Sequence, residues 1–123
     1  MQSADFTATL SDGKGNPGKV TVAFTMARAA QQKGHTVCII LMVEAVELGV
    51  PGVADGMDIG QPFEPVAELL RKYLQAGGRI AICRSCMVHN GFTDGQMDPR
   101  FEIITASQVI DLMMSAKGSL QLA

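Results

Sequence analysis

The feature that most constrains the fold is a continuous apolar run at residues 37–43, rich in β-branched side chains. A strand with one face in water alternates polar and apolar residues, whereas a run without polar positions must be covered on both faces. The run is far shorter than the roughly 20 residues that a membrane-spanning helix needs. It therefore predicts a buried strand inside a sheet that has helices on both sides.

The rest of the chain alternates between strand-like and helix-like segments, separated by loops rich in glycine at residues 13–19 and 49–62. Alternation and turn residues predict strands at residues 6–10, 36–43, 80–83, 101–104 and, as an edge strand, 120–122. Helices are expected at residues 20–33, between residues 65 and 76, at 85–90 and from residue 105 onward. This order predicts one α/β domain over residues 1–123, a three-layer α/β/α sandwich around a mostly parallel sheet of four to five strands.

The last expected helix carries both a start signal and an apolar stripe. Thr105 and Gln108 have the spacing of a capping box, in which each side chain bonds the other residue's main chain. The apolar residues that follow at helical spacing predict a stripe buried against the sheet, formed by Val109, Ile110, Met113 and Met114.

Composition and charge exclude several classes of protein. The 123 residues are 47% hydrophobic and 18% charged, which is typical of a folded domain rather than a disordered chain. Ten basic and twelve acidic residues give a net charge of −2 without a basic cluster, so we expect no nucleic-acid partner. The first residues lack the pattern of a secretory signal, and three cysteines do not fit a disulfide framework. We therefore expect a cytoplasmic protein without a membrane partner.

Two cysteines, Cys83 and Cys86, stand where a predicted strand ends and a short helix begins. The thiolate is the reactive form of cysteine, and a helix N-terminus or a nearby cation lowers the thiol pKa. Arg84 supplies a cation between the two cysteines, and His89 follows Cys86 by three residues on the same helical face. These features predict an activated thiol at the carboxyl edge of the sheet.

The cysteines also allow other interpretations. A structural zinc site needs four ligands, and the chain offers no second pair of cysteines or histidines. A three-ligand metal site from Cys83, Cys86 and His89 is less favoured, so we predict no metal and no cofactor. A thioredoxin-type pair would follow an early strand and a tryptophan, and this chain has no tryptophan. Cys38, inside the apolar run, is expected to be a core side chain.

The glycine-rich segment at residues 13–20 nearly matches a phosphate-binding loop, because it reads GKGNPGKV between a strand and a helix. Val20 stands where the hydroxyl that binds Mg²⁺ would be, so nucleotide hydrolysis is disfavoured. Anion binding by the loop amides stays open beside the simpler interpretation, a solvated connection. Asp12 and Glu44 are expected at the same sheet edge, where each could orient a substrate or simply end its strand.

The cysteine segment resembles the cysteine loop of the DsrE/DsrF-like proteins, which include the sulfur-relay subunits TusB, TusC and TusD and the YchN-like proteins. The resemblance also covers the helix that ends at Gly34, the apolar strand at residues 37–43 and the turn at Gly77 and Gly78. It implies the flavodoxin-like variant of the sandwich found in that family. In some members the sulfur-accepting cysteine matches Cys83, and YchN-like members have cysteine at both positions. An arginine that is often found before Gly91 is absent here.

The resemblance implies a sulfurtransferase-like carrier that accepts sulfane sulfur as a cysteine persulfide and passes it to a partner protein. Cys83 is slightly favoured as the acceptor; Cys86 would then resolve or release the sulfur, Arg84 would favour the thiolate and His89 would assist proton transfer. The family further implies sulfur donor and acceptor proteins as partners, and a homo-oligomer (trimer or hexamer) or a hetero-oligomer with paralogues. The alternatives are a thiol–disulfide or peroxiredoxin-like redox protein, and a non-enzymatic oligomeric module that binds a small ligand.

Overall fold

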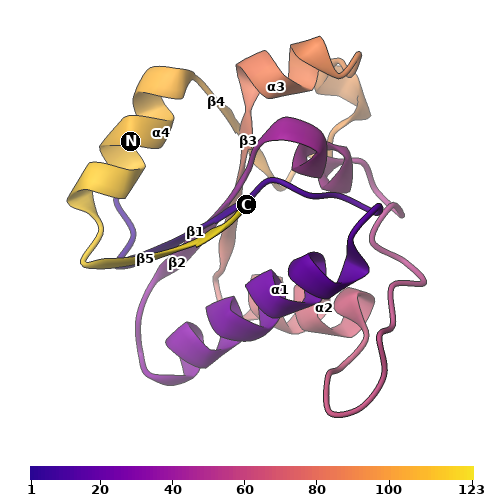
Figure 1. Cartoon of the computed structure of the whole chain (residues 1–123). Coiled ribbons are helices and arrows are strands. Elements are labelled where there is room, and N and C mark those ends of the chain that lie inside the picture. The colour runs from indigo at the N-terminus through magenta and orange to yellow at the C-terminus, as the bar shows by residue number, and fades with distance from the viewer.

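The computed structural model describes all 123 residues and contains one sheet of five parallel strands (Figure 1). The strands lie in the order β4-β3-β2-β1-β5, and every neighbouring pair is parallel. Their bounds are β1 (Phe6–Leu10), β2 (Val37–Leu41), β3 (Arg79–Cys83), β4 (Glu102–Ile104) and β5 (Gly118–Leu122). The expected β5 is thus confirmed as an edge strand.

The helices lie on both faces of this sheet and along one of its edges (Figure 1). They are α1 (Pro17–Gln32), α2 (Val66–Gln75), α3 (Arg84–His89) and α4 (Ala106–Ser115), with 3₁₀ segments η1 (Val43–Gly49) and η2 (Asp94–Gln96). From β1 to β4 the chain crosses the sheet in one direction, and right-handed connections put α1 and α2 on one face. The return from β4 to β5 runs the other way and puts α4 on the opposite face. The predicted three-layer α/β/α sandwich is confirmed.

Two hydrophobic cores fill the spaces between the layers. The larger core has 22 buried residues and lies between the sheet and helices α1 and α2. The smaller has 7, among them Cys38 and Ile40 of β2 together with Val109 and Leu112 of α4. Because successive side chains of a strand point to opposite faces, β2 contributes to both cores, as its uninterrupted apolar sequence predicted. Cys38 is fully buried, which confirms it as a core side chain.

Helix α1 begins earlier than the sequence predicted. The glycines and proline of residues 13–19 were expected to form a loop, yet the helix starts at Pro17. The Asn16 side chain caps it, since its Oδ1 accepts a hydrogen bond of 3.1 Å from the Lys19 N–H. Proline suits the first position of a helix because its missing N–H would have no partner there. The prediction of a loop up to Lys19 was therefore wrong.

Helix α4 buries a narrower stripe than the sequence predicted. Its capping box between Thr105 and Gln108 is present as expected. Of the predicted stripe only Val109 is buried, with Leu112 one turn later, whereas Ile110 is 58% exposed and Met114 81% exposed. A single helix covers this face of the sheet, and it contacts the small core along one line of side chains. The prediction that Ile110 and Met114 are buried is wrong.

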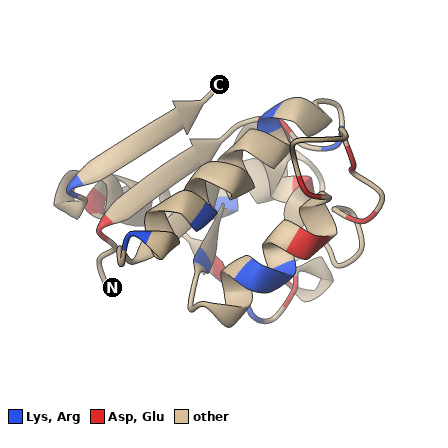
Figure 2. Ribbon diagram, turned by 90° about the horizontal axis from the view of Figure 1, so that it is seen from below, with Lys and Arg blue, Asp and Glu red and all other residues tan.

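Charged residues are spread over the surface rather than gathered by sign, as Figure 2 shows for the face with α1 and α2. This distribution agrees with the net charge of −2 and the absence of a basic cluster in the sequence. No helix combines the length and the hydropathy that crossing a lipid bilayer requires.

Candidate functional site

The carboxyl ends of the parallel strands meet at one edge of the sheet, where α/β proteins of this kind bind their ligands. Asp12 follows β1, Glu44 follows β2 and Cys83 ends β3. A hollow of about 280 Å³ opens at this edge between η1 and α3. Its lining residues are Val43, Glu44, Ser85, Cys86, His89 and Asn90.

The two cysteines differ in their access to solvent. Cys83 is the last residue of β3 and the N-cap of α3, and only 6% of it is exposed. Cys86 lies in the first turn of α3, is half-buried and lines the hollow. Cys83 lies close enough to Cys86 to contribute to the raised pKa of the Cys86 thiol. A molecule entering the hollow therefore reaches Cys86 first.

The environment of Cys86 raises the pKa of its thiol above the ordinary value. Burial is the largest cause, and the Cys83 sulfur and the Glu44 carboxylate act in the same direction, because each favours the uncharged thiol. The main chain of Val43 opposes them and lowers the pKa, but by less than burial raises it. The expectation of a lowered pKa is therefore wrong for Cys86, since α3 is short and no cation contacts the sulfur.

Arg84 does not act on the thiols as the sequence predicted. Its guanidinium bonds Asp94 of η2 through both terminal nitrogens, at 3.0 and 3.2 Å. The two charges compensate each other, and both side chains are exposed to solvent. His89, in contrast, lines the same hollow as Cys86. The structure thus places Cys86 and His89 on one hollow, with Cys83 buried at the end of β3, and pairs Arg84 with Asp94 of η2.

Two residues of the site, Val43 and Asn90, were not singled out in the sequence. Val43 has a φ of 53°, a left-handed conformation that β-branched residues rarely adopt. The Asn90 side-chain Nδ2 donates hydrogen bonds to the carbonyl of Val43 at 3.3 Å and to that of Cys86 at 2.8 Å. It thereby ties the start of η1 to α3. The only sequence signal was the place of Asn90 beside Gly91, at the end of α3.

The glycine-rich loop lines a second hollow, of about 530 Å³, that shares Glu44 with the first. Two donors of this segment already bind carboxylates. The Lys14 N–H donates a hydrogen bond to Glu47 Oε2 at 2.8 Å, and Lys19 Nζ lies 3.3 Å from Asp12. A Cβ at residue 13 would lie 1.9 Å from the same Glu47 oxygen, which explains the glycine there. The arrangement favours a closed connection over an anion site, because an anion would meet carboxylates.

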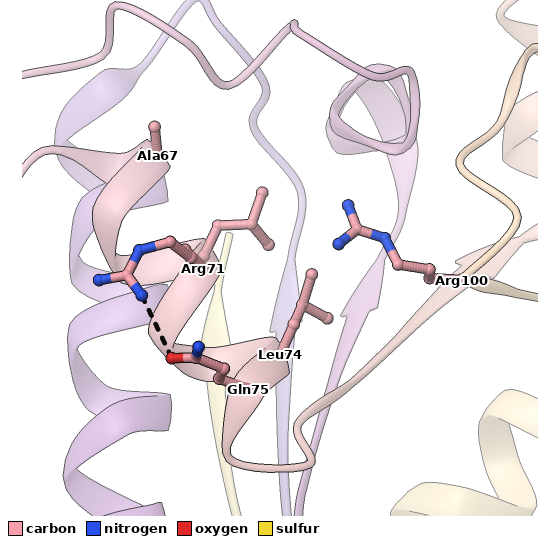
Figure 3. Close-up of a pocket in the computed structure, with 6 residues that line it drawn as sticks. Ala67, Arg71, Leu74, Gln75 and Arg100 are labelled. Atoms are coloured by element: carbon pink, nitrogen blue, oxygen red, sulfur yellow. Dashed lines mark hydrogen bonds between the residues drawn. The ribbon is translucent and has the colours of Figure 1, made fainter.

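A further hollow of about 440 Å³ lies between α2 and Arg100 (Figure 3). Leu70 and Leu74 form its apolar part, and Arg71 bonds Gln75 at 3.2 Å. Arg100 is held by Asp98, with Nη2 2.7 Å from a carboxylate oxygen. None of the side chains that line this hollow is a thiol, a histidine or a carboxylate, so the chemistry of the chain is concentrated at the sheet edge.

The residues that could bind a metal do not gather at one place. No three side chains of His, Cys, Asp and Glu come close enough to hold a metal ion, so the three-ligand alternative from Cys83, Cys86 and His89 is not assembled. Burial raises the pKa of the remaining thiol, Cys38, to about 12, which leaves it unreactive within the small core.

Comparison with known proteins agrees with the fold. The E. coli YchN protein has the same fold, with a TM-score of 0.75 and 15% sequence identity over 99% of this chain and 100% of that one. A conserved protein of unknown function from Bacteroides thetaiotaomicron superposes with a TM-score of 0.61 and 16% identity, covering 96% of this chain and 95% of its own. No curated protein matches the sequence. The model of the DsrE/DsrF-like family matches residues 5–121, and the chain therefore belongs to the DsrE/DsrF-like family.

Proposed function

We propose that this protein is a cytoplasmic sulfur carrier, which accepts sulfane sulfur on Cys86 as a persulfide and passes it to a cysteine of a partner protein. The observation that carries the proposal is the half-buried Cys86 thiol, which lines an open hollow at the sheet edge beside a second, buried thiol. Membership of the DsrE/DsrF-like family supports a role in sulfur relay.

The proposed transfer is neutral in oxidation and reduction. The Cys86 thiolate attacks the outer sulfur of a persulfide on the donor; a new S–S bond forms, the donor's S–S bond breaks and the donor leaves as a thiolate. An acceptor thiolate then attacks the same sulfur on Cys86 in the reverse sense. His89, which lines the hollow with Cys86, takes the thiol proton when the thiolate forms.

Exposure assigns different roles to the two cysteines. The sequence slightly favoured Cys83 as the acceptor, but a donor protein has better access to Cys86. Cys83 would act as the resolving thiol: its thiolate attacks Cys86 Sγ, forms a Cys83–Cys86 disulfide and releases the outer sulfur as hydrosulfide. In that step two thiols are oxidised and the sulfane sulfur is reduced. Arg84 has no part in this scheme, because Asp94 binds it.

Intact-mass analysis of single variants tests the proposal. After incubation with a small sulfane-sulfur donor and removal of excess donor, the native protein should gain the mass of one sulfur atom. Cys86→Ser should abolish this gain, whereas Cys83→Ser should keep the sulfur longer. Cys38→Ala, which changes only the buried core thiol, is the control. Uptake unchanged in both Cys83→Ser and Cys86→Ser would refute the carrier function, and uptake lost only in Cys83→Ser would reverse the two roles.

A second candidate function is thiol–disulfide or peroxide redox chemistry, which is favoured by two free cysteines at the junction of β3 and α3. A dithiol catalyst needs both thiols, so either single serine variant should abolish turnover of peroxide or of a disulfide substrate. A carrier needs only Cys86 to take up sulfur. The uptake by Cys83→Ser therefore separates the two functions.

We further propose that the chain associates with copies of itself or with paralogues, beside its sulfur donor and acceptor. Ile110 and Met114 support such an interface, because they lie one turn apart on α4 and both are exposed, and contiguous exposed apolar side chains commonly mark contacts. Light scattering of the native protein should give a mass above that of one chain, and Met114→Lys should lower it. A monomeric native protein would exclude self-association.

A further inference from the structure

The hollow that contains Cys86 carries a negative charge without a cation to compensate it. Glu44 is the only carboxylate among its lining residues, and no lysine or arginine lines it. His89, the other ionisable side chain there besides the thiol, belongs to a residue type that is ordinarily uncharged above pH 7. The nearest cation in sequence, Arg84, is paired with Asp94 at 3.0 Å. A molecule that reaches the Cys86 sulfur therefore meets a carboxylate in the same hollow.

The Glu44 carboxylate is free to act on an incoming molecule. It belongs to η1, its side chain is exposed, and none of the hydrogen bonds or ion pairs of the structure involves it. The other two carboxylates at this sheet edge are engaged. Asp12 lies 3.3 Å from Lys19 Nζ, and Glu47 accepts a hydrogen bond of 2.8 Å from the Lys14 N–H. Glu44 thus retains a charge that no neighbour within the chain offsets.

The negative charge continues beyond the Cys86 hollow along the sheet edge. Glu44 also lines the neighbouring hollow of about 530 Å³, together with Asp12 and Glu47. The only cation in that lining is Lys14, so three carboxylates face one lysine. A surface of one sign lowers the local concentration of ions of the same sign and raises that of opposite ions. Glu44 also raises the pKa of the Cys86 thiol, which agrees with a negative field at the sulfur.

We propose that Glu44 is a specificity-determining residue, whose carboxylate disfavours anionic sulfur compounds at Cys86 and favours a partner cysteine that lies among lysine or arginine side chains. The inference rests on the proposed function, in which Cys86 is the carrier thiol, and adds the chemical class of its substrates. Small anionic donors react slowly with Cys86, and sulfur is exchanged with a basic segment of a partner protein.

The selection matters because many small sulfane-sulfur donors are anions. When the Cys86 thiolate attacks the outer sulfur of thiosulfate, a new S–S bond forms, the S–S bond of thiosulfate breaks and its electron pair leaves with sulfite. Thiosulfate and sulfite both carry two negative charges, so Glu44 repels the donor on approach. A persulfide held among basic side chains of a partner instead brings a compensating charge to the same carboxylate.

Three methanethiosulfonate reagents that differ mainly in charge test the selection. In a Cys38→Ala, Cys83→Ser background Cys86 is the remaining thiol, and its rates are measured at pH 8 with the neutral hydroxyethyl, the anionic sulfonatoethyl and the cationic trimethylammonioethyl reagent. Dividing each rate by that of the neutral reagent cancels any change in the thiol pKa, because all three react with the same thiolate. Glu44→Gln should raise the anionic ratio about fivefold and lower the cationic ratio by a similar factor. Ratios equal to those of the parent would overturn the inference.

Asp111→Asn is the matched control, because it removes one exposed carboxylate from α4 and changes the net charge by the same amount. Its ratios should equal those of the parent; a change as large as that of Glu44→Gln would assign the selection to net charge and refute the role of Glu44. Salt provides a measurement that needs no Glu44 variant. The anionic ratio of the parent should rise in 1 M salt, where the Debye length is about 3 Å, and a ratio that does not respond to salt would also refute the inference.

Sulfur uptake separates this inference from the carrier function. If Cys86 takes up no sulfur from any donor while the reagent ratios change as expected, the carrier function is wrong and the charge selection at this thiol stands. If Cys86 takes up sulfur while the ratios stay unchanged, the carrier function stands and Glu44 has no part in its specificity.

Discussion

The strain at Val43 predicts an inverted order of stability for two small substitutions. Val43→Ala leaves one methyl group of the exposed side chain and Val43→Gly leaves none, and both variants retain the main-chain N–H. At most positions alanine is the more stabilising of the two, because glycine loses more conformational freedom on folding. At a φ of 53° the preference should reverse, since only glycine adopts this region without a penalty.

The magnitude follows from two opposing terms. The left-handed conformation costs alanine about 1–2 kcal/mol, and glycine loses about 0.5–1 kcal/mol through its larger unfolded-state freedom. Val43→Gly should therefore be more stable than Val43→Ala by about 0.5–1 kcal/mol. Val88 is the matched control, as an exposed valine inside α3, where glycine should be about 1 kcal/mol less stable than alanine. The two pairs should thus differ by roughly 1.5–2 kcal/mol.

Urea unfolding of the four variants, followed by circular dichroism, measures the difference directly. For a domain of this size each kcal/mol also moves the thermal midpoint by a few degrees, which provides an independent reading. The reasoning is refuted if Val43→Ala is as stable as Val43→Gly while the Val88 pair behaves normally. In that case the turn at residue 43 relaxes freely, and its left-handed conformation stores no strain.

The structure supports four further expectations. Because the pKa of Cys86 is raised, the rate of alkylation of this thiol should increase about tenfold for each pH unit between pH 7 and 9, without a plateau. A plateau of the rate below pH 8 would contradict this expectation. Arg84→Gln should leave that pH profile in place, because the guanidinium is bound to Asp94; a shift to higher pH would restore the role predicted from the sequence. Tyr73→Phe should lower the free energy of unfolding by about 1–2 kcal/mol without changing Cys86 alkylation, because the buried hydroxyl bonds the carbonyls of Val37 and Arg79. The Arg79–Glu102 pair lowers the pKa of Glu102 in the folded state, so its contribution to stability is present above about pH 4.5 and is lost as the pH falls. In Glu102→Gln the free energy of unfolding should therefore decrease less between pH 5 and pH 3 than in the native protein.

The order and type of the elements could be predicted because local pattern and tertiary burial agree for most of the chain. The apolar run at residues 37–43 requires cover on both faces, and β2 contributes to both cores. Thr105 and Gln108 form their capping box with groups that are adjacent in sequence. In both cases the interactions that decide the structure are encoded by neighbouring residues or by simple periodicity.

The errors have two causes. The start of α1 was missed although its signals are local, because Asn16 caps the helix and Pro17 is its first residue; other errors arise where distant groups decide the outcome. The exposure of Ile110 and Met114 depends on how much of the sheet a single helix can cover. The spacing of apolar residues predicts which side of α4 faces the sheet, but it does not predict how many of those residues the sheet can cover.

The site shows the same division between local and distant causes. The parallel topology places Glu44 and Cys83 at one edge, so the sequence located the chemistry correctly. The distribution of charge around the thiols was mistaken, because Arg84 has a carboxylate partner ten residues away in η2. Nor does a valine signal a left-handed turn, since its local preference opposes that conformation. The hydrogen bond from Asn90 Nδ2 to the Val43 carbonyl links this turn to α3. Val43 thus adopts a conformation that opposes its own preference beside the hollow that Cys86 lines, and strained main chain of this kind is typical of functional sites rather than of positions selected for stability.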